Sequence, residues 1–171
     1  SPKISIGLSP VLSEMLADDL FKEEFSAYLD QKIEAAGADA AEFYRTGERK
    51  YHDLARMWED FYRDIKFYFE DRIDRNIVGA FKRLQDGNHI EIITCAATHG
   101  YLPLLGRDTS VQAQIMTGVE VYERHFGRKP RGFWLPECAY RPRYEWAPPA
   151  ECGPAREPVL RKGVDEFLHE A

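Results

Sequence analysis

Three short apolar runs, set between long helical stretches, constrain the fold of this chain more than any other feature. The first covers residues 4–8, where apolar side chains alternate with Ser5 and Gly7, and the others cover residues 90–94 and 132–135. Each run has the length and residue types of a β-strand. Strands that alternate with helices predict a parallel sheet with helical crossover connections. A β/α barrel and an open doubly wound sheet both fit this order.

Helical spacing dominates the first half of the chain. Ser9 is placed to cap a helix with Pro10 in its first turn, where the missing N–H costs nothing. A second helical stretch is expected to end near Gly37. From about residue 48 to 85, apolar residues recur every three or four positions, which predicts long helices with an aromatic stripe in the core.

So long a helical stretch needs an interruption, because its length is unusual for one helix of a globular domain. We expect the break close to Asp71 or Asp74, either of which could cap the next helix. Further on, the aromatic and proline-rich residues 140–149 are expected to form a loop. A last helix is expected to start around Glu157 or Pro158.

Charge and cysteine content exclude several classes of partner. The formal net charge of -6 offers no attraction to nucleic acid or to an anionic membrane, and no apolar run is long enough to span a bilayer. The three cysteines, Cys95, Cys138 and Cys152, form no CxxC pair and no zinc-type cluster with histidine. We therefore expect neither a metal nor a cofactor, and a reduced cytoplasmic compartment is the simplest interpretation.

The beginning of the chain suggests an excerpt of a longer protein. It starts at Ser1 without an initiator methionine and enters a strand-like pattern at once. Three strands also cannot close a barrel, which takes about eight in the standard form.

The two later strands end in segments that carry functional groups. In a β/α barrel the active site lies at the carboxyl ends of the strands. Glu137 directly follows an apolar strand that ends in Pro136, which places a fixed, partly desolvated carboxylate where a nucleophile is needed. Alternatively, Glu137 caps a neighbouring helix or pairs with an arginine such as Arg141 or Arg143. Its position alone does not decide between these interpretations.

His99 and four aromatic residues are the other candidates for a binding site. His99 follows a strand and precedes Gly100, which lets backbone approach a ligand, although a structural histidine is the commoner case. For Trp134 on its strand, packing in the core is the favoured interpretation, whereas Trp146 in a polar loop is a better candidate for stacking. Four residues could offer ring faces to a ligand: Trp134, Tyr101, Tyr140 and Trp146.

These motifs resemble those of glycoside hydrolase family 57. Residues 91–105 look like one signature region of that family, and residues 132–140 look like the next, which holds the nucleophilic glutamate. The linking residues 114–130 and the start of the chain are similar as well, so the resemblance covers essentially all of it. The residues around His99 and after Glu137 resemble the branching-enzyme branch more than the 4-α-glucanotransferases or amylopullulanases.

The resemblance implies a fold, a reaction and a partner. Residues 1–171 would be a helix-rich α/β part of a distorted (β/α)7 TIM-like barrel, incomplete in this chain. The family works with retention through two carboxyl groups. Glu137 would attack the anomeric carbon of an α-1,4-glucan, such as amylose or a glycogen-like polymer. Capture of the glycosyl-enzyme by a 6-hydroxyl of a glucan would form an α-1,6 branch.

The departures from the family pattern also carry expectations. The chain lacks the family's first histidine motif and stops before its catalytic aspartate motif, and neither Asp108 nor Asp165 lies in such a motif. These residues alone are therefore expected to have no turnover, because general acid catalysis contributes on the order of 10²–10⁴-fold. A 4-α-glucanotransferase, an α-amylase-type hydrolase and a non-catalytic glucan-binding remnant stay open as alternatives. A metal-dependent deacetylase is the least favoured.

Overall fold

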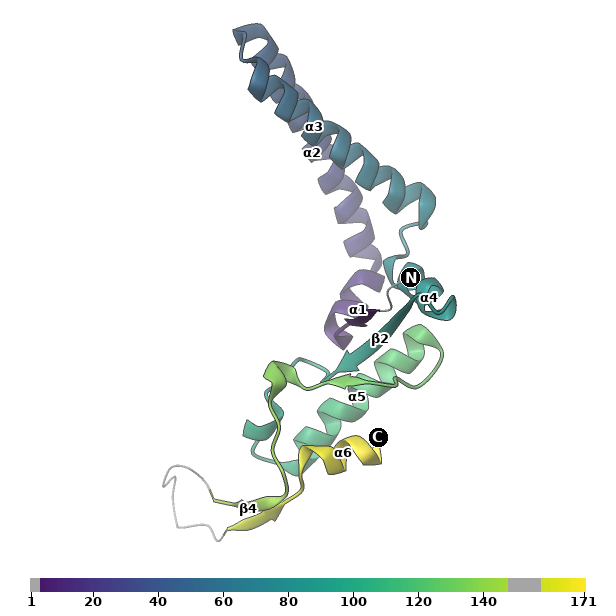
Figure 1. The fold of residues 1–171 in the computed structure, drawn as a ribbon, viewed down its shortest axis with the longest axis vertical. Coiled ribbons are helices and arrows are strands. Elements are labelled where there is room, and N and C mark those ends of the chain that lie inside the picture. Colours follow the sequence, from purple (N-terminus) through teal and green to yellow (C-terminus); the bar gives the residue numbers. More distant parts are fainter. Residues whose placement is uncertain (1–3, 148–157) are drawn as a thin grey trace. The chain divides into compact units, whose positions relative to one another are not determined.

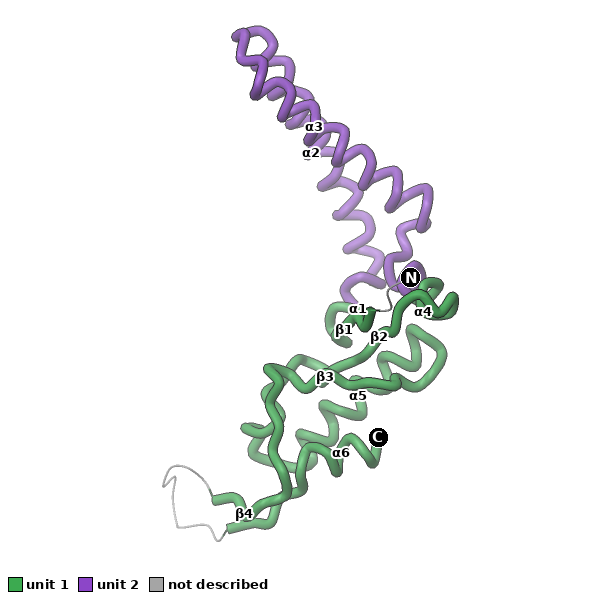
Figure 2. The backbone as a smooth tube through the Cα atoms, in the orientation of Figure 1, with its two compact units in different colours: residues 1–13, 82–171 green, residues 14–81 purple. Residues whose placement is uncertain are grey.

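A computed structural model of the protein describes residues 4–147 and 158–171 (Figure 1). The chain divides into two compact units (Figure 2). Unit 1 comprises residues 1–13 and 82–171, and unit 2 comprises residues 14–81. Unit 1 carries the described strands and both motifs named above, whereas unit 2 is helical.

A parallel sheet of three strands forms the framework of unit 1. The strands are β1 (Ile4–Gly7), β2 (Ile90–Cys95) and β3 (Phe133–Trp134), with β2 in the middle. All three form at the predicted runs, with β2 one residue longer and β3 shorter than expected, and their parallel arrangement is confirmed. Because Thr94 pairs with Phe133, the strands β2 and β3 end at the same edge of the sheet.

Helix α5 (Asp108–Phe126) lies against β2 and ends at Gly127, whose left-handed conformation with φ 73° suits a glycine cap. Its contact with the strand is close. The hydroxyl of Thr94 donates to the carbonyl of Gly118 at 3.0 Å. A Cβ atom on Gly118 would stand 2.2 Å from the carbonyl oxygen of Cys95, so this position accepts only glycine.

The core of unit 1 lies between α5, the segment after β2, and the last helix, α6 (Val164–Glu170). Phe133 and Leu135 pack against its edge. The fully buried members of this core come from elements far apart in the sequence: Ala96, Leu102, Val111, Ile115, Val164 and Phe167.

Near the end of the chain the predicted loop and helix are partly wrong. Strand β4 (Tyr144–Trp146) pairs antiparallel with β5 (Val159–Arg161), and α6 starts only at Val164. The helix starts there because the backbone N–H of Gly163 donates to the side chain of Glu166 at 2.9 Å, which is a capping interaction. Residues 148–157, including Glu157 and Cys152, lie outside the described part.

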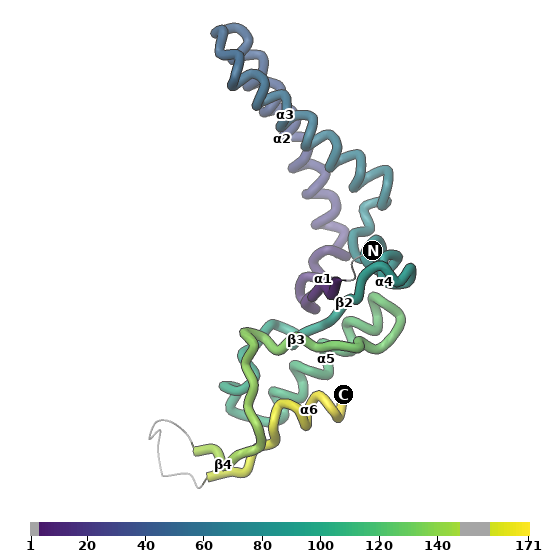
Figure 3. Tube along the Cα trace, in the orientation of Figure 1, coloured from purple at the N-terminus to yellow at the C-terminus, as the bar shows by residue number. Residues whose placement is uncertain are grey.

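Unit 2 is built on a hairpin of two long helices, α2 (Asp19–Thr46) and α3 (Arg49–Phe67), which run out and back along one another (Figure 3). The expected end of a helix near Gly37 is wrong, because α2 continues to a left-handed cap at Gly47. Gly37 lies within α2 and faces α3, where a Cβ atom would make an ordinary contact at 3.6 Å with the carboxyl carbon of Glu59. No described helix combines the length and the apolar character that a membrane crossing requires.

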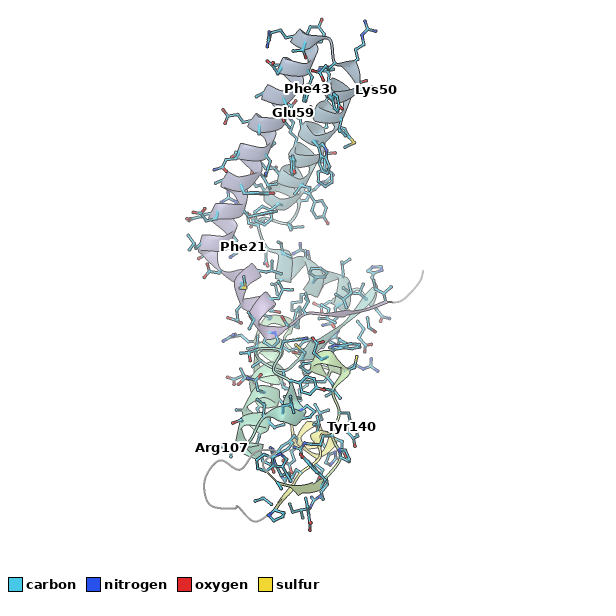
Figure 4. All side chains as sticks on the ribbon, turned by 90° about the vertical axis from the view of Figure 1, so that its left-hand side faces the viewer. Phe21, Phe43, Lys50, Glu59, Arg107 and Tyr140 are labelled. Carbon is cyan, nitrogen blue, oxygen red and sulfur yellow. The ribbon has the colours of Figure 1, made fainter. Side chains whose placement is uncertain are left out.

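The hairpin contains one buried carboxylate, that of Glu59, which Figure 4 labels. Glu59 is 6% exposed and accepts hydrogen bonds from Arg63 at 2.7 Å and from Arg56 at 2.6 Å. The hydrogen bond from Arg63 is the largest cause that lowers the pKa of the Glu59 carboxyl. Two arginines thus offset the cost of placing a charge at the contact between the helices.

The aromatic stripe of α3 is not core within this chain, contrary to expectation. The two helices pack through small residues, Ala36, Ala40 and Ala55, which turns the large side chains of α3 outward. Periodicity identifies such a stripe but does not say which face of the helix the neighbour covers. Each of these residues is more than 40% exposed: Tyr51, Leu54, Trp58 and Phe61.

The predicted break after α3 is confirmed, but its cap is a different residue. A π-helical turn (Tyr68–Arg72) follows α3, and α4 (Ile77–Asp86) begins after it. Neither predicted aspartate, Asp71 or Asp74, caps α4. Asn76 does so, because its side-chain oxygen accepts the backbone N–H of Gly79 at 2.7 Å. At the start of α1 (Pro10–Ala17), the hydroxyl of Ser9 caps as predicted, accepting the N–H of Leu12 at 3.2 Å.

We predict that Gly118→Ala destabilises the protein by about 1–3 kcal/mol or more, as overpacking does in tight interiors. The added methyl group meets backbone that cannot turn away, and α5 must move off β2. Thermal or denaturant unfolding measures the effect. Gly106→Ala is the matched control, because nothing lies within 4 Å of a Cβ placed there. Equal stability of the two variants would contradict this account of the contact.

Candidate active site

The two motifs predicted from the sequence meet at the carboxyl ends of β2 and β3. His99 lies in the turn after β2, and Glu137 lies in the short 3₁₀ turn η3 (Pro136–Cys138) after β3. The Nε2 atom of His99 is 3.5 Å from Oε1 of Glu137. Both side chains are open to solvent, 47% exposed for His99 and 69% for Glu137. An acceptor-only carboxylate and a titratable ring are thus presented together at the edge of the sheet.

Both residues sit on strained backbone. His99 has φ 57°, Glu137 has φ 56° and Cys138 has φ 54°, in the left-handed region that favours glycine. Such positions cost on the order of 1–3 kcal/mol each and persist only where the surroundings impose them. In the second turn, the N–H of Cys138 donates to the carbonyl of Leu135 at 2.9 Å. Strain in both turns marks them as candidates for function.

A glutamine of α5 holds the turn that carries His99. The backbone N–H of Thr98 donates to Oε1 of Gln114 at 3.0 Å, and Nε2 of Gln114 donates to the Thr98 hydroxyl at 2.9 Å. The main-chain carbonyl of Gln114 also accepts the N–H of Ala97 at 2.9 Å. We did not identify Gln114 from the sequence, because a half-buried glutamine on a helix carries no local signal. The turn at Thr98 that needs a partner was the available clue.

A buried thiol lies behind the histidine. The Sγ atom of Cys95, which is 5% exposed, is 3.6 Å from Nδ1 of His99. Burial raises the pKa of the Cys95 thiol. The sulfur is therefore an S–H group that can donate a weak hydrogen bond. Cys138, beside Glu137, is exposed.

The described residues do not form the alternative arrangement, in which an arginine binds Glu137. Arg143 donates to Glu166 through Nε at 2.9 Å and through a second nitrogen. This hydrogen bonding is the largest cause that lowers the pKa of Glu166 to about 2. Arg141 is buried, with its guanidinium 4.8 Å from the ring centre of Tyr144. Within the described part of the chain, the ion pair recorded for Glu137 is the one with His99.

Three of the four aromatic candidates present open rings. Trp134 is 49% exposed, so its expected packing in the core is wrong. Its neighbour Phe133 packs against the core instead, and successive residues of a strand point to opposite faces. Tyr101 is also exposed, and so is Tyr140, whose hydroxyl donates to Asp165 at 3.2 Å (Figure 4).

Trp146 is placed differently from the expected loop position. It lies half-buried in β4, and the guanidinium of Arg161 stands 5.6 Å from its ring centre. One face of the indole is therefore already in contact with a cation. Of the four aromatic residues, Trp146 has the least free ring surface for a ligand.

The aspartates that the sequence analysis set aside are engaged elsewhere. Asp108 accepts from the guanidinium of Arg161 at 2.7 Å and from the N–H of Lys162 at 3.3 Å. Asp165 accepts the hydroxyl of Tyr140. Over the residues that the structure describes, no group of three or more His, Cys, Asp or Glu side chains could hold a metal ion.

We predict that Gln114→Ala loosens the turn before His99 and lowers the stability by about 1–2 kcal/mol, since several hydrogen bonds are lost. Hydrogen exchange gives a sharper readout. The Thr98 amide, which donates to the side chain, is expected to exchange faster, whereas the Ala97 amide keeps its bond to the main-chain carbonyl. Gln112→Ala, on an exposed position of the same helix, is the control. Unchanged exchange at Thr98 would rule out this role.

The sequence was compared with known proteins. Residues 15–170 match the family described as glycosyl hydrolase family 57. The chain is 44% identical over 168 residues to the 1,4-alpha-glucan branching enzyme TK1436 of Thermococcus kodakarensis. That alignment covers 98% of this chain but 23% of the relative, so the chain spans about a quarter of that protein's length.

Solved structures give the same picture. A GH57-type branching enzyme from Pyrococcus horikoshii matches with a TM-score of 0.88 and 44% identity, over 98% of this chain and 30% of that one. The alpha-amylase AmyC from Thermotoga maritima matches with a TM-score of 0.80 and 28% identity, over 98% of this chain and 28% of that one. The helix-rich α/β character of the chain is that of these enzymes. On this combined evidence, the chain belongs to glycosyl hydrolase family 57.

Proposed function

We propose that this chain carries the nucleophile of a retaining α-glucan active site, in a 1,4-α-glucan branching enzyme. One observation carries the proposal: Glu137, at the end of a parallel strand, stands 3.5 Å from His99 at the end of the neighbouring strand. The 44% identity to a protein named as a branching enzyme supports the choice of reaction. Residues 1–171 are then part of a (β/α)7 catalytic barrel.

The reaction proceeds in two displacements at one carbon. A carboxylate oxygen of Glu137 attacks the anomeric carbon of an α-1,4-glucan, and the bond to the leaving glucan oxygen breaks. A second carboxyl group protonates that oxygen, at a distance of roughly 5–5.5 Å from the nucleophile in retaining enzymes. In the family this group is an aspartate, and we assign it to no residue of this chain. A 6-hydroxyl of a glucan then displaces Glu137 and gives its proton to the second carboxyl group, now a carboxylate, which restores the α configuration and leaves an α-1,6 branch.

The remaining candidates are proposed to bind the glucan. The ring of His99 donates a hydrogen bond at the reacting sugar. Open rings of Trp134, Tyr101 and Tyr140 offer faces for sugar stacking, in line with their exposure. Trp146 contributes less, because Arg161 already contacts its ring. No cofactor takes part in a reaction of this type.

A hydrolase of the same family is the second candidate. The 28% identity to an enzyme named as an alpha-amylase, at a TM-score of 0.80, favours it. The two reactions share the glycosyl-enzyme on Glu137 and differ in the acceptor, which is a glucan hydroxyl or water. A 4-α-glucanotransferase would use a 4-hydroxyl, and a non-catalytic remnant would form no intermediate.

We expect Glu137→Gln in the full-length protein to lower turnover on amylose by more than about 10³-fold, because the amide cannot act as the nucleophile. Counting α-1,6 linkages after debranching, together with the release of reducing ends, measures branching and hydrolysis separately. Glu120→Gln, an exposed acid of α5, is the control. A fluorinated glucosyl donor should leave its sugar covalently on the peptide that holds Glu137. Full activity of Glu137→Gln would refute the proposal, and reducing ends without new branches would favour the hydrolase.

A further inference from the structure

A small polar cavity lies at the edge of the sheet opposite the candidate active site. Its volume is about 180 Å³, and the turn after α4, the start of β2 and the loop after α5 surround it (Figure 1). The six residues of β2 separate it from the turn that carries His99 by on the order of 20 Å, at about 3.3 Å per residue. Catalytic groups of parallel β/α sheets lie at the carboxyl edge, so this cavity takes no part in the proposed reaction.

A buried amide with an unpaired donor lines the cavity. Gln85 is 4% exposed, and its Oε1 atom accepts the backbone N–H of Ile92 at 2.8 Å and the hydroxyl of Tyr122 at 2.9 Å. These contacts fix the orientation of the carboxamide, because a flipped amide would direct its nitrogen at the N–H of Ile92. Nε2 of Gln85 is therefore a buried donor, and it has no acceptor in the structure. Such a donor is costly to leave unpaired.

Two arginines at the mouth of the cavity are also unpaired. Arg128 and Arg131 both line it, and both are exposed. Neither guanidinium forms an ion pair or a hydrogen bond with any residue that the structure describes. Two guanidinium groups beside one cavity offer paired donors to the oxygens of a phosphate or carboxylate.

The carboxylates that line the cavity are engaged to different degrees. Asp86 pairs with Lys82 at 2.5 Å, so its charge is balanced. Glu91 accepts the hydroxyl of Ser5 at 3.0 Å, which leaves its charge in place and one carboxylate oxygen open. The open groups are thus two cations, one amide donor and one acceptor. A bare anion would satisfy the cations and be repelled by Glu91, whereas a ligand that also carries hydroxyl groups would satisfy both.

The walls of the cavity are held by main-chain hydrogen bonds. In the turn after α4, the N–H of Gly87 donates to Arg83 at 2.9 Å, and the N–H of His89 donates to Leu84 at 2.9 Å. On the other side, the carbonyl of Gly132 accepts the N–H of Thr94 at 3.2 Å, which ties the loop after α5 to β2. A site between such fixed segments needs little rearrangement to bind a ligand.

We propose that this cavity binds a small phosphorylated sugar. The phosphate oxygens accept hydrogen bonds from Arg128 and Arg131, a sugar hydroxyl donates to Glu91, and the uncharged end of the ligand lies toward Gln85. The volume of about 180 Å³ is several times the roughly 30 Å³ that a water molecule takes in the liquid, so the cavity has room for more than a bare phosphate ion. The inference goes beyond the proposed function and does not depend on it.

The first test measures binding to the full-length protein by titration calorimetry, with glucose 6-phosphate and inorganic phosphate as probes. We expect saturable binding of both, with the ester at least about tenfold tighter, because the hydroxyl groups add contacts. Equal affinities would overturn the sugar part of the proposal. Absence of saturable binding by either probe would overturn the whole of it.

The second test locates the bound ligand. A variant that combines Arg128→Gln and Arg131→Gln is expected to raise the Kd of glucose 6-phosphate at least about tenfold, since charge-assisted hydrogen bonds are lost. Arg49→Gln, an exposed arginine of α3, is the matched control and should leave Kd unchanged. An unchanged Kd in the double variant would place the ligand elsewhere and defeat the proposal.

The same variants separate this site from the candidate active site. We expect the double arginine variant to keep its turnover on amylose without added ligand, and Glu137→Gln to keep its affinity for glucose 6-phosphate. Loss of that affinity in Glu137→Gln would mean that the ester binds at the candidate active site, which overturns this inference and leaves the proposed function standing. Retained turnover in Glu137→Gln defeats the proposed function alone, and the calorimetry still decides the cavity.

Discussion

The parallel pairing of β2 with β3 is the constraint on which the candidate site depends. Cys95 pairs with Trp134 in the sheet, and the two turns that follow carry His99 and Glu137. Because side chains alternate along a strand, a shift of the pairing by one residue would exchange the faces of the sheet to which Phe133 and Trp134 point. The turn after β3 would then leave the sheet in another direction. The short strand β3 thus sets the distance between the two candidate side chains, although it contributes few hydrogen bonds itself.

Helix α5, which packs against β2, supports the same candidate site. It approaches β2 closely enough at Gly118 that the hydroxyl of Thr94 reaches the helix backbone, and four positions earlier Gln114 holds the turn before His99. One helix therefore fixes both the strand and the turn that follows it. This explains how His99 can keep a left-handed conformation, which an unsupported loop would relax. Sites on rigid elements hold their side chains more precisely than sites on free loops.

Sequence reasoning singled out Glu137 and His99 as candidates because each follows an apolar run and stands beside a proline or glycine, which are strong local signals. It failed where the contacts or the exposure of a side chain depend on a residue far away in the chain. The role of Gln114 depends on a turn 16 residues earlier, and the exposure of Trp134 depends on which face of β3 the core covers. Strand β5 was predicted to be part of a helix. Its pairing partner β4 lies earlier in the chain, in residues that were predicted to be a loop, so no strand signal marked the pair. The aromatic stripe of α3 shows the same limit, since periodicity does not reveal which face the small residues of α2 cover.

The exposure of the candidate site also bears on how the proposed nucleophile, Glu137, would work. Glu137 and His99 are both open to water in this structure, so their contact at 3.5 Å is weak here. A bound glucan would displace that water and lower the local dielectric, which strengthens every polar contact that remains. The contact between Nε2 of His99 and Oε1 of Glu137 would then gain strength when the sugar is in place.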